Sequence, residues 1–359
     1  MLNDDTSYVP TLAVRPSEMN GLEYLPSKTK SRMLPCFLLA PWANSKTLDR
    51  ALERIHRAFP NRKFFLDIDL DYNFSNLEIE SQIEFAKLQD LRKSGLHWVE
   101  FIECSDWIIP CVQTRGQTEN EIRNQIERIR KLGRTFCMRI ERSRFPSNLD
   151  EVVAAFKVGG TADFAIILEG GWARDPLTLE AWFTGVIQGS LREFGQNVPI
   201  VVSSTSMPKN FSSIEGVELF PYGSRVLFDN ISRRWANLFR LVYGDWGSTR
   251  PRERPSFATC PLPRIDYPID DALCIARSKK NEWDYKDAAV EIVNCTCRWD
   301  GKLGVWGEEM IQKTAINSHF GIDTPQKNVA SRVNIHLHLQ AWHGAPDIRG
   351  MDFDEDWVD

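Results

Sequence analysis

The chain has 359 residues, of which 42% are hydrophobic and 26% charged, and its formal net charge is −5. This is the composition of a globular protein, and the acidic balance gives no electrostatic reason to expect nucleic acid as a partner. No apolar run approaches the ~18 residues of a membrane-spanning helix, and the opening MLNDDTSYVP is polar. We therefore expect a cytoplasmic protein with no membrane partner.

Short runs of β-branched and aromatic residues recur about every 30 residues, the length of a strand-plus-crossover unit. They occupy residues 8–15, 34–41, 63–70, 97–104, 135–141, 163–169 and 198–204, with a closing strand at 242–248. Amphipathic helical stretches separate them, at 17–25, 46–59, 78–94, 117–132, 147–158, 176–194 and 228–241. The order predicts an α/β fold, a (β/α)8 TIM-barrel-like domain over residues 5–250.

The alternation ends in a segment rich in proline and arginine, residues 249–263, which indicates a loop or boundary. A strand pair at 264–269 and 272–278, a helix at 284–296 and a helical or extended stretch at 333–342 follow. They predict a C-terminal α+β extension, residues 251–343, packed on the barrel. Residues 344–359 are acidic and are predicted to be disordered.

The segment DIDLDY, residues 67–72, carries three acidic residues with period-two spacing. On a strand, Asp67, Asp69 and Asp71 point to the same face. Such a column can bind a divalent cation such as Mg²⁺ through oxygen ligands. The alternative is structural: Asp67 pairs with an arginine inside the barrel, and Asp71 is a loop residue or helix cap.

Further charged residues fall on the fifth and sixth predicted strands. Arg139 and Glu141 share a face of the fifth strand, and Glu169 ends the sixth. Because buried charges must be paired, a network of Asp67 and Asp69 with Arg139 and Glu169 is expected. Such a network is either a structural salt-bridge layer or a polar active site.

Two other strand ends carry candidate residues. Arg15, with Glu18, follows the first strand, where it either recognises an anionic ligand or stabilises the turn as an ion pair. Gly244 and Asp245 end the closing strand, where the glycine allows close backbone approach and the aspartate faces the mouth or caps the next segment.

Several short blocks of the chain form a recognisable series. They are YVPTLAVRPSEMNGLEYL (8–25), MLPCFLLAP (33–41), YGDW (243–246), RIDY (264–267) and the stretch around His336 and His338. In this order they resemble the phage-encoded beta protein family, found on satellite prophages and other mobile elements. The sequence departs from the family pattern at the C-terminus, where an adjacent histidine pair is usual but Leu337 separates these two.

The resemblance implies a barrel-like α/β fold and a role in conflict between phage and host. The founding member is linked to neutralising a killer protein encoded beside it, in a prophage module that acts in phage defence. The family has no established reaction, so the resemblance carries over no catalytic residue. The protein is accordingly interpreted as a phage-defence or immunity component that binds a protein partner encoded in the same gene neighbourhood.

The alternative interpretation is an enzyme at the barrel mouth, a metal-assisted phosphodiesterase or other hydrolase. The candidate catalytic residues are Asp67, Asp69, Glu169 and Asp245. The candidate ligand-binding residues are Arg15, Arg139 and Arg264. No hydrolase, metalloprotease, phosphate-loop or dinucleotide-binding signature surrounds them.

Overall fold

A computed structural model describes the chain over residue 2 and residues 6–345, apart from 77, 159, 161–163, 176, 253–260, 281 and 296–297. Nearly all of the acidic segment predicted to be disordered, residues 346–359, lies outside the described residues. Within the described part, no helix combines the length and apolarity that a membrane crossing requires.

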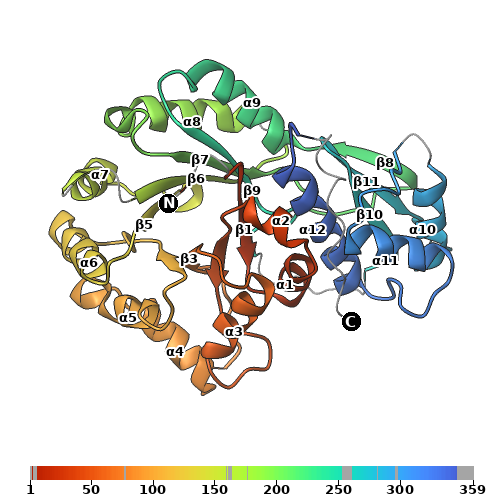
Figure 1. Ribbon diagram of the computed structural model, residues 1–359, viewed down its shortest axis with the longest axis horizontal. Coiled ribbons are helices and arrows are strands. Elements are labelled where there is room, and N and C mark those ends of the chain that lie inside the picture. Colours follow the sequence, from red (N-terminus) through yellow and green to blue (C-terminus); the bar gives the residue numbers. More distant parts are fainter. Residues whose placement is uncertain are drawn as a thin grey trace.

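Eight parallel strands form a nearly closed barrel in the left part of Figure 1, in the order β4-β3-β2-β1-β9-β7-β6-β5. A single parallel bridge between Cys111 and Cys137 links the two edge strands. The strands are β1 (Tyr8–Ala13), β2 (Cys36–Leu39), β3 (Phe64–Ile68), β4 (Ile108–Pro110), β5 (Phe136–Glu141), β6 (Phe164–Trp172), β7 (Ile200–Thr205) and β9 (Leu241–Asp245). The predicted mixed α/β barrel is thereby confirmed.

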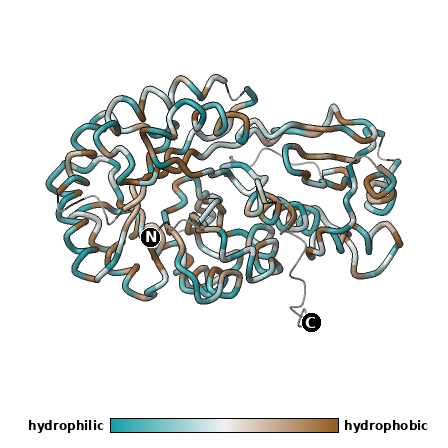
Figure 2. Tube along the Cα trace, turned by 45° about the horizontal axis from the view of Figure 1, so that its top comes forward, coloured by the Kyte–Doolittle hydropathy of each residue, from teal (hydrophilic) through white to brown (hydrophobic). Residues whose placement is uncertain are grey.

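Helices surround the strands (Figure 1). Amphipathic helices among them bury their apolar face. In α3 (Asp49–Ala58), for example, Leu52 and Ile55 are buried, and a capping box of Thr118 and Glu121 begins α6 (Glu119–Lys131). The helices are α1 (Pro16–Glu23), α2 (Ser27–Ser31), α3 (Asp49–Ala58), α4 (Glu80–Leu88), α5 (Arg92–Ile102), α6 (Glu119–Lys131), α7 (Leu149–Lys157), α8 (Leu177–Gln188) and α9 (Gly223–Trp235). Figure 2 shows hydrophobic residues concentrated along the barrel strands.

The strand predicted at residues 97–104 is wrong, because most of this segment belongs to helix α5. Its buried residues Trp98, Val99 and Ile102 have the spacing of one helical face, which a short apolar run does not distinguish from a strand. The fourth strand is instead the three-residue β4. Because β4 is so short, its periodicity is hard to recognise in the sequence.

A second, three-stranded antiparallel sheet lies beside the barrel, with helices α10 (Tyr285–Asn294) and α11 (Trp306–Ala315) near it (Figure 1). Its order is β10 (Arg264–Pro268), β11 (Ala272–Arg277) and β8 (Gly216–Pro221). Strand β8 comes from the connection between β7 and α9, so this sheet draws on both sides of residue 250. The predicted domain boundary and the C-terminal extension stay predictions.

The last helix, α12 (Pro325–Ala341), lies between the barrel and the second sheet (Figure 1). Val333 and Leu337 belong to the barrel's main hydrophobic core, whereas Ile335 and Leu339 pack with residues of the second sheet. A helix that contributes to two cores is apolar on two faces. This explains why its sequence alone left helical and extended conformations open.

Candidate functional site

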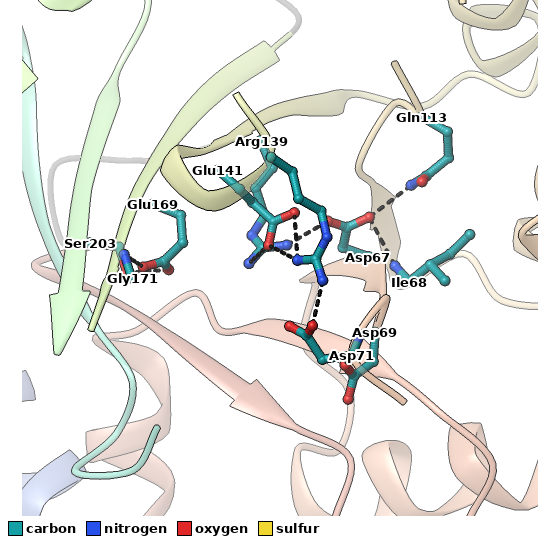
Figure 3. A network of polar contacts seen from close by, with 11 residues as sticks. Asp67, Ile68, Asp69, Asp71, Gln113, Arg139, Glu141, Glu169, Gly171 and Ser203 are labelled. Carbon is teal, nitrogen blue, oxygen red and sulfur yellow. Dashed lines mark hydrogen bonds and ion pairs between the residues drawn. The ribbon is translucent and has the colours of Figure 1, made fainter. Parts of the chain in front are cut away.

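Asp67 and Arg139 form a buried ion pair near the carboxyl ends of β3 and β5, which together with the other strand ends we call the mouth of the barrel. Arg139 Nη1 lies 3.0 Å from Asp67 Oδ2, and its Nη2 lies 3.0 Å from Glu141 Oε1 (Figure 3). The other oxygen of Asp67 accepts hydrogen bonds from Gln113 Nε2 at 2.7 Å and from the Ile68 amide at 2.8 Å. The guanidinium therefore joins two carboxylates, and Asp67 has no oxygen without a donor.

The ion-pair chain continues to the rim of the mouth. Arg144, on the loop after β5, lies 3.4 Å from Glu141 Oε1 and also pairs with Asp71. Three carboxylates and two guanidinium groups thus alternate from Asp67 to Asp71. Alternation of this kind neutralises most of the charge, as the expected salt-bridge layer requires.

Asp69 does not join this chain of ion pairs, although the sequence placed it on the same strand face. It lies just beyond the end of β3 and pairs with Arg252. Burial raises the pKa of Asp69, and although Arg252 opposes this effect, the pKa stays above its ordinary value.

The acidic residues do not converge on a cation site. Across the described ranges, no three His, Cys, Asp or Glu side chains are grouped so that they could hold a metal ion. Asp67 and Asp69 are each paired with a different arginine. This donor set does not fit a Mg²⁺ ion, the metal-binding alternative for the DIDLDY segment.

Glu169 lies on β6, to one side of the Asp67–Arg139 pair (Figure 3). Its carboxylate accepts hydrogen bonds from Ser203 Oγ at 2.9 Å and from the Gly171 amide at 2.8 Å. Burial raises the pKa of Glu169 above its ordinary value, and the positive charge of Arg139 counteracts part of that shift. Glu169 and Asp69 are thus the two candidate carboxyl groups whose pKa is raised, so each is protonated more readily than an exposed carboxyl group.

The mouth contains an open cavity of about 570 Å³, which we call the mouth hollow. Asp67, Gln113, Arg139 and Glu141 are among its lining residues, together with Arg144 and Phe145 from the loop after β5. Its size is that of a small-molecule site. The sequence pointed to Asp67 and Arg139, but it missed Gln113 and Arg144, because neither lies within a predicted strand.

Asp245 is placed in the interior rather than in the mouth hollow. Oδ2 accepts hydrogen bonds from Tyr243 Oη at 2.8 Å and His336 Nε2 at 2.7 Å, while Oδ1 accepts them from Tyr8 Oη and the Gly247 amide. Burial raises the pKa of Asp245, but His336 and the hydroxyl and amide donors bring it below its ordinary value. Asp245 thus ties β1, β9 and α12 together, and its catalytic assignment stays a prediction.

The two remaining arginine candidates also have acidic partners. Arg15 Nε donates to Glu18 Oε1 at 2.7 Å, as the turn-stabilising alternative expected. Arg264, on β10, donates from Nε to Asp266 Oδ1 at 2.8 Å and stacks 3.8 Å over the Phe211 ring. Arg264 belongs to the second sheet, so the structure does not bring the three ligand-binding candidates into one site; their binding roles stay predictions.

Comparison with known proteins gives two findings. A family described as Beta protein matches residues 8–341, which is almost the whole described chain. The chain is also 26% identical over 363 residues to "Protein beta" of Enterobacteria phage P4, with 98% of each chain covered.

Proposed function

Because this chain belongs to the Beta protein family, we propose that it is a protein-binding component of a mobile-element module for phage defence or killer-protein immunity. The similarity to a phage-encoded protein over the full length supports the mobile-element part of this proposal. The binding partner is a protein encoded in the same gene neighbourhood. The protein acts in the cytoplasm, where such a partner is made.

An exposed aromatic ridge at the mouth is the observation that carries the proposal. Phe145, 43% exposed, stands between the mouth hollow and a second hollow of about 770 Å³. The second hollow runs along α8, where Trp182 meets the Phe145 ring edge-to-face with the centroids 6.0 Å apart. Exposed aromatic rings beside arginines and concave surfaces are typical of protein-binding hot spots.

Arginines surround this ridge and add polar recognition. Arg142 lines the second hollow, whereas Arg144 and Arg115, the latter on the loop between β4 and α6, line the mouth hollow. Arginine is enriched at protein interfaces because its planar guanidinium group forms bidentate hydrogen bonds with carboxylates and stacks on aromatic rings. Carboxylates such as Glu141 and Glu151 line the same hollows. The surface therefore fits a partner that presents an apolar side chain flanked by polar groups of both charges.

The test is co-expression of the protein with the products of the adjacent genes, followed by affinity purification and phage plating. Phe145→Ala should lose the copurifying partner and the protection against phage. Leu238→Ala is the matched control, because Leu238 is 58% exposed and precedes β9 at the opposite end of the barrel. Copurification and protection that survive Phe145→Ala would refute this binding surface. If the wild-type protein copurifies with no product of the adjacent genes, the proposal itself is refuted.

A hydrolase at the barrel mouth is the second candidate, favoured by Arg139, which lines the mouth hollow, and by Glu169 on the neighbouring strand β6, whose pKa burial raises. In this alternative Glu169 is a general acid, and Arg139 orients an anionic substrate. Glu169→Gln should then abolish hydrolysis of phosphodiester or carboxylic ester substrates while the partner still copurifies. A wild-type protein that hydrolyses none of these substrates, with or without Mg²⁺, removes this alternative.

A further inference from the structure

A pocket between the barrel and the second sheet has a basic and aromatic lining. Its volume is about 640 Å³, and its walls come from the ends of β6 and β7, from β8 and from the start of α9. Among its lining residues are Trp172, Phe220 and Val226, together with Arg174 and Lys209. We call it the basic pocket, because the described lining includes two cationic side chains and no carboxylate.

The aromatic wall of the basic pocket is held in a fixed orientation. Trp172 Nε1 donates a hydrogen bond to the Met207 carbonyl at 2.7 Å. Lys209 Nζ lies 4.2 Å from the centre of the same indole ring. The pocket therefore presents an oriented aromatic surface with positive charge beside it, which suits an acidic ligand with an aromatic or aliphatic body.

The chain itself contains a segment of this chemistry. Residues 346–359, PDIRGMDFDEDWVD, contain one basic residue, Arg349, and two aromatic residues, Phe353 and Trp357. The six acidic residues are Asp347, Asp352, Asp354, Glu355, Asp356 and Asp359. The charge of this segment is opposite to that of the basic pocket, and its two aromatic residues match the apolar lining.

The segment is attached within reach of the pocket, at the end of α12, where the Ala341 carbonyl accepts a hydrogen bond from Ser7 Oγ at 3.0 Å. Arg225, in the first turn of α9, hydrogen-bonds through Nη2 to Gln340 Oε1 near the end of α12. Its neighbours Gly223 and Val226 line the basic pocket. Residues 346–359 can span up to about 46 Å when extended at ~3.3 Å per residue, which is ample for a segment anchored beside this helix.

From the complementary charge, the aromatic lining and the point of attachment, we propose that the acidic C-terminal segment, residues 346–359, folds back and binds in the basic pocket of the same chain. The aromatic side chains enter the pocket, and the carboxylates pair with Arg174 and Lys209. Because these pairs lie at an open surface, salt weakens the interaction.

The experiment compares amide hydrogen exchange in the full chain with that in a chain ending at Ala345. In the shortened chain, peptides covering residues 206–226 should exchange about tenfold faster, equivalent to ~1.4 kcal/mol of lost protection. A synthetic peptide of residues 346–359 should restore the protection at low salt. Equal exchange in the two chains over residues 206–226 overturns the proposal.

Charge reversal in the full chain gives an independent readout. Arg174→Glu combined with Lys209→Glu should reproduce the faster exchange, whereas Lys286→Glu, on the exposed surface of α10, should leave exchange unchanged. Dilution of the full chain distinguishes binding of the segment within one chain from binding to the pocket of a second copy. Protection that persists on dilution supports the proposal, and protection that disappears on dilution overturns it in favour of self-association.

Discussion

The imidazole of His336 meets the carboxylate of Asp245 in the interior, with 2.7 Å between Nε2 and Oδ2. Both side chains are buried, at 1% and 3% exposure. Because a carboxylate only accepts hydrogen bonds, Nε2 carries the proton that lies between them. This contact joins the last helix of the chain to the last strand of the barrel, across more than 90 residues of sequence.

Replacing the imidazole should therefore lower stability. His336→Leu removes one donor to a buried carboxylate, and the loss of a hydrogen bond to a charged group costs about 1.5–3 kcal/mol. The change is measured as a shift of the urea midpoint at pH 7. His319→Leu, at an exposed position, is the control and should stay within about 0.5 kcal/mol of wild type. Equal midpoints for the two variants would contradict a stabilising role for the pair.

The acid limb of the stability curve should depend on Asp245. Its pKa in the folded protein lies below its ordinary value, so the folded state binds fewer protons than the unfolded state as the pH falls. The stabilisation is complete above the unfolded pKa of about 3.9 and disappears as the pH falls through the lower folded pKa. Asp245→Asn should reduce stability at pH 7. It should also make the melting temperature depend less on pH below about pH 4. An unchanged acid limb would assign the acid sensitivity to other groups, such as Asp266, whose pKa is also lowered.

Glu169 should behave in the opposite direction. Because burial raises its pKa, the folded state binds a proton that the unfolded state has already lost, and stability increases as the pH falls toward that pKa. Glu169→Gln keeps an acceptor for the Gly171 amide and removes the cost of burying a charge. We expect the variant to be as stable as wild type or more stable at pH 8, with a weaker gain on acidification. Strong destabilisation at pH 8 would show that the ionised carboxylate is itself stabilising.

The sequence was informative where a residue's partners lie on neighbouring strands. The expected network of Asp67 and Asp69 with Arg139 and Glu169 contains one pair that the structure shows, Asp67 with Arg139, because period-two alternation fixes which side chains share a face. Glu169 instead accepts hydrogen bonds from Ser203 and the Gly171 amide, and Glu141 takes the second place beside Arg139. The same alternation did not predict the partner of Asp69, which is Arg252 from the segment after the last barrel strand, β9. No periodicity relates a residue to a loop more than 180 positions away.

Helix α12 shows a second limit. The two-residue spacing of His336 and His338 suggests a shared function only on a strand, since on a helix their directions differ by about 200°. The structure makes the segment helical, and the two side chains accordingly find different partners, Asp245 and Thr29. Choosing helix over strand depended on the two cores that α12 contacts, which the local sequence does not encode.

Arg139 should be the most sensitive residue of the mouth network. Arg139→Met leaves Asp67 and Glu141 without their shared cation, and breaking a buried ion pair costs about 3–5 kcal/mol. Adding Asp67→Asn should recover part of that loss, with a coupling of about 0.5–3 kcal/mol in a double-mutant cycle of urea midpoints. Arg50→Met, in an exposed pair with Glu53, should give no measurable change. Additive effects of the two mouth substitutions would contradict direct coupling of Asp67 and Arg139.

Gly244 tests the close packing at the end of β9. A Cβ atom there would lie 2.7 Å from Val201 Cγ1 and 2.8 Å from the Val9 carbonyl oxygen, on both neighbouring strands. The added methyl group fits only if β1 or β7 moves away from β9, which weakens the strand pairing. Gly244→Ala should therefore destabilise the protein by about 1–3 kcal/mol. Gly185→Ala is the matched control, since nothing lies within 4 Å of its added Cβ. There the alanine should raise stability by up to about 1 kcal/mol, because it favours helix α8. Opposite shifts of the urea midpoint are thus expected for one chemical change, and shifts of the same sign would show that the strand ends are more adaptable than their contacts imply.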